Sequence, residues 1–256
     1  MTYRLVRFPS GRDVGMTGIG DPAARHLAIF FHPTPGASGF DPDPTVTARS
    51  GLHILTFDRP GYGATEPDNL QVSEWVDDLA GYLRSAESTA ITSTGTKYGP
   101  IAVIGWREGG IYAAAFATRH PHLVSRLALV GAPAPKRASI DTDPEVINRR
   151  KQLAKLMEKN SRPGYQDRLD HMREAAYVHG GIGATADRNA FKDVPPPSSN
   201  APALILYSAG DSYATIQDAN WYAAGMPNAQ VERVEAAVGP IADRWEEVLR
   251  FVREPN

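Results

Sequence analysis

Cysteine is absent from this chain of 256 residues. Disulfide bonds, thiolate metal sites and a cysteine nucleophile are therefore excluded. The sequence also lacks an apolar run long enough to cross a membrane, and its first residues lack the apolar core of a signal peptide. We therefore expect a cytoplasmic protein that has no membrane partner.

The sequence also lacks a large excess of positive or negative charge. The formal net charge is −2 at pH 7, which gives no electrostatic reason to expect a nucleic-acid partner. No histidine pair or carboxylate cluster has the spacing of a metal site, and no glycine pattern predicts a dinucleotide or phosphate loop. The sequence therefore predicts no metal and no cofactor, and it leaves the oligomeric state open.

What is present is an alternation of short apolar stretches with helical ones. Two early stretches, 3–8 and 13–20, favour a hairpin, and a short helix is expected shortly before Gly51. Further strands are expected at 26–31, 53–58, 101–105, within 124–133, within 201–211 and at 229–236, and helices at 73–87, 108–121, 214–227 and 241–252. This order predicts an α/β fold with a mostly parallel sheet that has helices on both faces.

The composition changes between residues 135 and 200, where the chain is polar and bounded by prolines. Helices are expected at 143–160 and 164–178, and the segment His179–Gly183 is interpreted as a flexible turn. We therefore predict an α/β core of residues 1–134 and 201–256, with residues 135–200 inserted as a helical cap. Since open α/β sheets bind ligands at the carboxyl ends of their strands, the cap is expected to cover that edge as a lid.

Four segments resemble motifs of the α/β hydrolase superfamily, and they occur in the order of that family. They are His32-Pro-Thr-Pro-Gly36, Asp58-Arg-Pro-Gly-Tyr-Gly-Ala-Thr65, Gly105-Trp-Arg-Glu-Gly-Gly110 and the stretch from Leu206 to Thr215. The resemblance implies the α/β-hydrolase fold with an inserted helical lid. It also implies a site in which a serine stands at a strand-to-helix elbow, an acid follows a later strand, and a histidine follows the last strand.

Two of those three side chains are missing from the matching positions. Arg107 stands at the apex of the elbow, and the step Gly239-Pro240 stands where the family has glycine and histidine. None of the seven histidines follows Asp211, the residue that matches the family's acid. The resemblance is therefore to an atypical member that lacks the serine nucleophile and the catalytic histidine.

An arginine at the elbow offers only hydrogen-bond donors and stays protonated, so it cannot act as a nucleophile or base. Arg107 is interpreted either as a clamp for an anionic ligand or as the partner of Asp211 or Glu108 in an ion pair, and the two roles can coexist. Asp211 either contacts the ligand as a base or acceptor, or only pairs with Arg107. Glu108 is interpreted mainly as a helix cap, with a general base as the alternative.

The resemblance assigns the remaining site residues to the loop after the third strand. His32 is expected to bind the ligand or to hold this loop by hydrogen bonds. The N–H of Thr34 is expected to form an oxyanion hole together with the N–H of Glu108. The cap histidines His171 and His179 are expected either to face the pocket or to lie on the surface.

These residues predict a non-hydrolytic enzyme of the lyase, isomerase or cyclase type. Its substrate would be a small organic molecule, either neutral or anionic, bound between the core and the lid. The alternative is a catalytically inactive protein that binds a ligand or a partner. A third hypothesis is a hydrolase with an unrecognised nucleophile. Its candidates Ser38, Ser208 and Ser212 are expected to have no histidine nearby.

Overall fold

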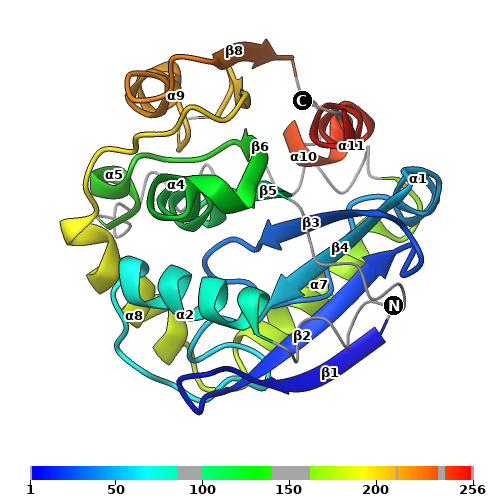
Figure 1. Ribbon diagram of the computed structural model, residues 1–256, viewed down its shortest axis with the longest axis vertical. Helices are drawn as coiled ribbons and strands as arrows, with labels where there is room; N and C mark the ends of the chain where they lie inside the picture. Colours follow the sequence, from blue (N-terminus) through cyan, green and yellow to red (C-terminus); the bar gives the residue numbers. More distant parts are fainter. Residues whose placement is uncertain (1, 86–99, 140–161, 212, 236–239, 255–256) are drawn as a thin grey trace.

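An eight-stranded sheet runs through the protein in the order β1-β2-β4-β3-β5-β6-β7-β8 (Figure 1). The computed structural model describes residues 2–85, 100–139, 162–211, 213–235 and 240–254. Strands β1 and β2 form the predicted hairpin, β2 pairs antiparallel with β4, and all other neighbours are parallel. The predicted mostly parallel α/β sheet is therefore confirmed. The strands are Thr2–Arg7, Asp13–Gly20, His26–Phe31, Leu52–Phe57, Ile101–Trp106, Val124–Val130, Ala203–Ser208 and Ala229–Val234.

Helices cover both faces of this sheet. On one face α2 (Val72–Arg84), α4 (Gly109–Arg119) and α9 (Ile216–Ala223) share an apolar core with the strands. On the other face lie α1 (Pro44–Arg49), α10 (Pro240–Asp243) and α11 (Trp245–Arg253). The central strand β5 is buried along its whole length, which explains why its sequence is apolar without alternation.

Helix α11 shows why these segments fold as they do. Its buried residues Trp245, Val248, Leu249 and Val252 recur at helical spacing, and acidic residues in its first turn and basic ones in its last complement the helix dipole. Helix α2 begins earlier than expected. Its cap residue is Gln71, not Ser73, and the backbone N–H of Gln71 donates to Glu74 Oε2 at 2.7 Å.

Between β6 and β7 the described elements are all helical. They are α5 (Pro135–Ser139), α7 (Tyr165–Ala176), α8 (Ile182–Ala190) and the short 3-10 helix η2 (Phe191–Asp193). Helix α7 confirms the expected segment 164–178, whereas 143–160 lies outside the described residues. Helix α8 is not among the expected helices, because its first residues belong to the segment interpreted as a flexible turn. The turn is formed at Gly180 and Gly181, with φ of 66° and 83°, and it leads directly into the helix. The division into a core and a cap that acts as a lid stays a prediction.

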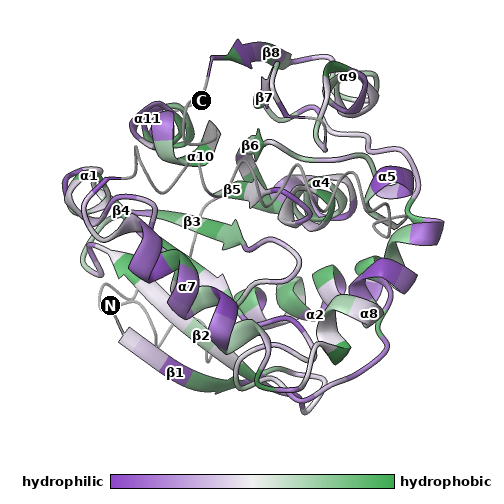
Figure 2. Cartoon of the chain, turned by 180° about the vertical axis from the view of Figure 1, so that it is seen from behind, coloured by the Kyte–Doolittle hydropathy of each residue, from purple (hydrophilic) through white to green (hydrophobic). Residues whose placement is uncertain are grey.

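Hydropathy follows this layering. Figure 2 shows hydrophobic colour along the central strand β3, while α7 carries hydrophilic turns on the outside of the molecule. Among the described residues, we find no helix with the length and apolar content needed to span a bilayer.

Candidate active site

The turn between β5 and α4 places Arg107 in a strained backbone conformation. Its φ is 54°, and within the described ranges no other residue except glycine has a positive φ. Such a conformation costs free energy and persists only where the surrounding structure enforces it. The elbow predicted from the glycine frame is therefore formed, with a guanidinium at its apex.

The glycines of this frame are required by close packing. A Cβ on Gly105 would lie 2.5 Å from the Cα of Gly110, and one on Gly109 would lie 2.1 Å from the backbone oxygen of Phe31. Both distances are far shorter than van der Waals contact. Helix α4 can therefore start close to β3 and β5 only because these residues have no side chain.

Arg107 and Asp211 form the expected ion pair. Arg107 Nη1 donates to Asp211 Oδ2 at 2.8 Å, and the two side chains are 22% and 6% exposed. The other oxygen of Asp211, Oδ1, accepts from the backbone N–H of Tyr213 at 2.9 Å. The pair thus lies partly open to solvent at the carboxyl ends of β5 and β7. The role of Arg107 as a clamp for an anionic ligand stays a prediction.

Glu108 is turned toward the loop after β3 and not toward the helix that follows it. Glu108 is the N-cap residue of α4, as expected, but its side chain makes no cap hydrogen bond to that helix. Its buried carboxylate accepts instead from the N–H of Thr34, at 3.0 Å, and from the hydroxyl of Tyr213. The Thr34 donor expected in an oxyanion hole is thus bonded to Glu108 in this structure.

Tyr213 is a central residue that the sequence did not reveal. Its hydroxyl donates to Glu108, its backbone N–H donates to Asp211, and its ring lies 5.6 Å from the guanidinium carbon of Arg107. The residue is buried. Tyr213 therefore joins the three candidate catalytic side chains into one cluster. The only sequence signal was its place two residues after Asp211.

His32 holds the loop after β3. Its Nδ1 donates to the backbone oxygen of Pro33 at 2.9 Å, and its Nε2 accepts from the N–H of Arg59 at 3.4 Å. Burial, and then the neighbouring Arg59 guanidinium, hold the pKa of His32 well below its usual value. The structure therefore supports the loop-holding role, and ligand binding by His32 stays a prediction.

This buried neutral histidine makes stability depend on pH. In the unfolded chain a histidine binds a proton as the pH falls through about 6.5, whereas native His32 stays neutral. We therefore expect His32 to lower the free energy of unfolding by up to about 1.4 kcal/mol for each pH unit below 6.5. Urea unfolding of wild type and His32→Asn between pH 7.5 and 5.5 measures this. The variant should show the shallower dependence, and equal slopes would contradict the expectation.

A buried ion pair links α8 to the same loop, and sequence reasoning missed it. Asp187 accepts from Arg59 Nη2 at 2.6 Å and from Thr34 Oγ1 at 2.5 Å. The hydroxyls of Tyr62 and Tyr112 also donate to it, at 2.8 and 2.6 Å. Burial by itself raises the pKa of Asp187, but the Arg59 charge and these hydrogen bonds outweigh it and leave the pKa lowered. Asp187 is thus a charged anchor between α8 and the core.

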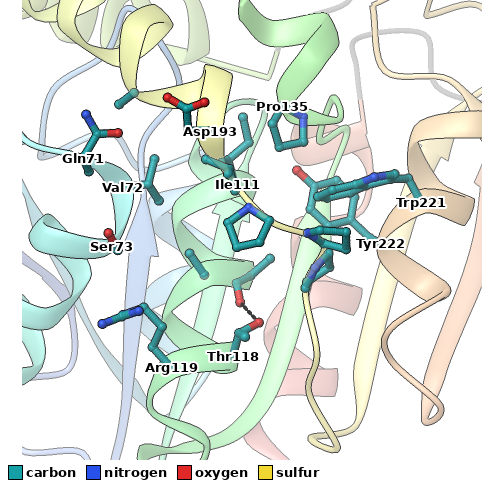
Figure 3. A pocket seen from close by; sticks show the side chains of 17 residues that line it. Gln71, Val72, Ser73, Ile111, Thr118, Arg119, Pro135, Asp193, Trp221 and Tyr222 are labelled. Carbon is teal, nitrogen blue, oxygen red and sulfur yellow. Dashed lines mark hydrogen bonds between the residues drawn. The ribbon is translucent and has the colours of Figure 1, made fainter.

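Two cavities lie away from Arg107. One, of about 130 Å³, is a mostly apolar groove between α4, α9 and the prolines after η2, where Ile111, Trp221 and Tyr222 converge (Figure 3). The other, of about 610 Å³, lies beside α7, and Ser38, His171 and His179 line it. Ser38 therefore does share a cavity with two histidines, against expectation. Neither cavity is lined by Arg107, Glu108 or Asp211.

Comparison with known proteins gives one family. The sequence profile described as the alpha/beta hydrolase family matches residues 28–251. The chain is 26% identical over 219 residues to a pimeloyl-[acyl-carrier protein] methyl ester esterase of Aromatoleum aromaticum, covering 73% of this chain and 80% of that protein. It is 29% identical over 184 residues to a 2-hydroxy-6-oxo-2,4-heptadienoate hydrolase of Pseudomonas putida, covering 61% and 63%.

Solved structures support the same fold. An enol-lactonase of Burkholderia xenovorans superposes with a TM-score of 0.72 at 17% identity, over 98% of this chain and 100% of that one. An esterase of Exiguobacterium antarcticum superposes with a TM-score of 0.70 at 15% identity, over 97% of both chains. The predicted α/β-hydrolase fold is therefore confirmed.

The same comparisons correct the predicted activity. The relatives found by sequence are named as esterases and a hydrolase, and structural neighbours are also named for hydrolysis. These names point to hydrolysis. The prediction of a lyase, isomerase or cyclase is therefore wrong, and so is its alternative of an inactive protein. A changed residue at the elbow alters the nucleophile but does not require a different class of reaction.

Proposed function

This chain belongs to the alpha/beta hydrolase family, and from that premise we propose that it hydrolyses a carboxylic ester or lactone bond in a small organic substrate. The relatives named as methyl ester esterases support the ester class. The observation that carries the proposal is the cluster of Arg107, Glu108 and Asp211 at the elbow, joined by Tyr213.

We propose further that the reaction runs without a serine at the elbow. Residue 107 is an arginine, and the last histidine of the sequence is His179, upstream of Asp211. A guanidinium cannot attack a carbonyl, but it can stabilise the negative oxygen that forms when another group does. The attacking group in this proposal is a water molecule.

Glu108, which follows Arg107 in the sequence, supplies the base. As Glu108 removes a proton from water, the water oxygen bonds to the carbonyl carbon, and the carbonyl electron pair moves onto its oxygen. Arg107 stabilises that oxyanion, while Asp211 holds the guanidinium in place. When the intermediate collapses, the bond to the alcohol oxygen breaks, and the proton held by Glu108 passes to the leaving alkoxide. The products are a carboxylic acid and an alcohol.

This mechanism differs from the family's usual one in an observable way. Since no acyl group is transferred to the protein, short p-nitrophenyl esters are expected to release nitrophenol without a burst. Hydrolysis of these esters and of aliphatic methyl esters should persist after treatment with a serine-directed fluorophosphonate. Mass spectrometry of the treated protein should show no adduct.

Two results would overturn the proposal in different parts. Failure to hydrolyse any ester or lactone in the panel removes the proposed activity. Hydrolysis that is abolished by a fluorophosphonate adduct on a serine keeps the activity but removes the water mechanism. Peptide mapping of the adduct would then identify the nucleophile.

A further inference from the structure

The larger cavity lies apart from the elbow and has the size of a ligand site. Its volume is about 610 Å³, within the range of roughly 300–1,000 Å³ that is usual for small-molecule sites. It is lined by the N-terminal hairpin, the loops after β3 and β4, and helix α7, and it is open to solvent on one side. Its lining includes Asp58, Glu66, Ala175, Val178 and His179.

Asp58 is a buried carboxylate in the wall of this cavity. Its residue is only 1% exposed, and it accepts from the N–H of Ser38 at 2.6 Å and the N–H of Ala64 at 3.2 Å. Burial raises the pKa of Asp58 although these hydrogen bonds act in the opposite direction. The carboxylate thus has three neutral donors, the two backbone N–H groups and the hydroxyl of Tyr3 at 3.4 Å, and none of them carries a net charge.

Asp187 and Asp211, two other buried acids of this protein, each have an arginine beside them. Asp187 pairs with Arg59 at 2.6 Å, and Asp211 pairs with Arg107 at 2.8 Å. Across the ranges that the structure describes, no lysine or arginine forms an ion pair with Asp58. A buried carboxylate without a counter-charge is costly, so a cation supplied from outside would find a strong partner here.

The rest of the lining agrees with a positive ligand that carries an apolar group. Glu66 adds a second acid, and the lining set contains no lysine or arginine. The Nε2 atom of His179 is buried, with no hydrogen-bond partner in the described part of the chain. Ala175 and Val178 supply an apolar wall. An anion would meet two carboxylates and no lysine or arginine in this lining.

We propose that this cavity binds a small organic ammonium ion, with its N–H donors toward Asp58 and Glu66 and its alkyl substituent against Ala175 and Val178. The site is separate from the Arg107 cluster, because the cavity is lined by none of its members. Its occupation does not depend on whether the chain hydrolyses esters.

The test is a titration of the full chain with n-butylammonium chloride, followed by NMR of ¹³C-labelled histidine rings. The signal of His179, assigned by its loss in His179→Gln, should shift and saturate. Sodium butyrate and 1-butanol have a similar alkyl chain but lack the ammonium group, and they should cause no saturable shift. An equal response to butyrate or butanol, or no saturation with butylammonium, would overturn the proposal.

Charge variants locate the site. Glu66→Gln should weaken butylammonium binding about twofold to fivefold, as expected for an exposed charge. Asp58→Asn should weaken it at least about tenfold, as expected for a buried one. Glu174→Gln removes an exposed acid of α7 that does not line the cavity and should leave the affinity unchanged. If Asp58→Asn fails to fold, the comparison of Glu66→Gln with Glu174→Gln still decides, and equal affinities in these two overturn the proposal.

Discussion

Asp187→Asn is expected to lower the free energy of unfolding by about 3–5 kcal/mol, the usual cost of removing one partner of a buried ion pair. Arg59 would keep its charge in a site where it is 1% exposed, and the hydroxyls of Tyr62 and Tyr112 would lose a charged acceptor. For a chain of this size the loss corresponds to a fall in Tm of roughly 6–20 °C. Urea and thermal unfolding measure both quantities.

Asp170→Asn is the matched control for this prediction. Asp170 also lies on a helix between β6 and β7 and pairs with an arginine, Arg173, at 3.2 Å, but both side chains are about half exposed. Its replacement should change the free energy of unfolding by less than about 1 kcal/mol. Equal effects of the two replacements would show that the Asp187 network does not anchor α8.

A double-mutant cycle separates the ion pair from the rest of the network. Arg59→Met combined with Asp187→Leu removes both charges, so the double variant should be less destabilised than the sum of the single ones. It should not regain full stability, because Arg59 also donates to the backbone oxygens of His32 and Pro33. The remaining loss reports the hydrogen bonds of the loop.

The fold could be predicted because its signals are local. Continuous apolar stretches gave the strands of the parallel sheet, and the glycines around Arg107 gave the elbow, since only residues without a side chain fit beside β3. Helix α8 was missed because its sequence, Ile182–Ala190, is short and follows two glycines, which favour a turn. Its buried polar residue, Asp187, has a partner 128 residues away in the sequence.

The site could be predicted only in part, for a related reason. The Arg107–Asp211 pair followed from two motifs whose places in the fold were implied by the family resemblance. The direction of the Glu108 side chain could not be predicted from the sequence. Helix propensity depends on the residues of the same turn, whereas the partners Thr34 and Tyr213 lie 74 and 105 residues away. Local preference placed Glu108 at the N-cap, while two tertiary hydrogen bonds set the direction of its side chain.

Glu108→Gln is expected to lower kcat for ester hydrolysis by about 10²–10⁴-fold, the usual contribution of a general base. Glutamine keeps an oxygen that can accept from the Thr34 N–H or the Tyr213 hydroxyl, but it cannot take a proton from water. The KM should change little, since the proposed base acts on water and not on the bound ester. Steady-state kinetics with a p-nitrophenyl ester measure both constants.

Two comparisons distinguish this role from a structural one. Tyr213→Phe keeps the carboxylate of Glu108 and removes one hydrogen bond to it, so kcat should fall by roughly 10–100-fold, less than in Glu108→Gln. Glu246→Gln, at an exposed acid of α11, should leave kcat unchanged. If Glu108→Gln retained wild-type kcat while it lowered Tm, the carboxylate would only tie the loop after β3 to the elbow. The base would then have to be another group, and Asp211 is the carboxylate that pairs with Arg107.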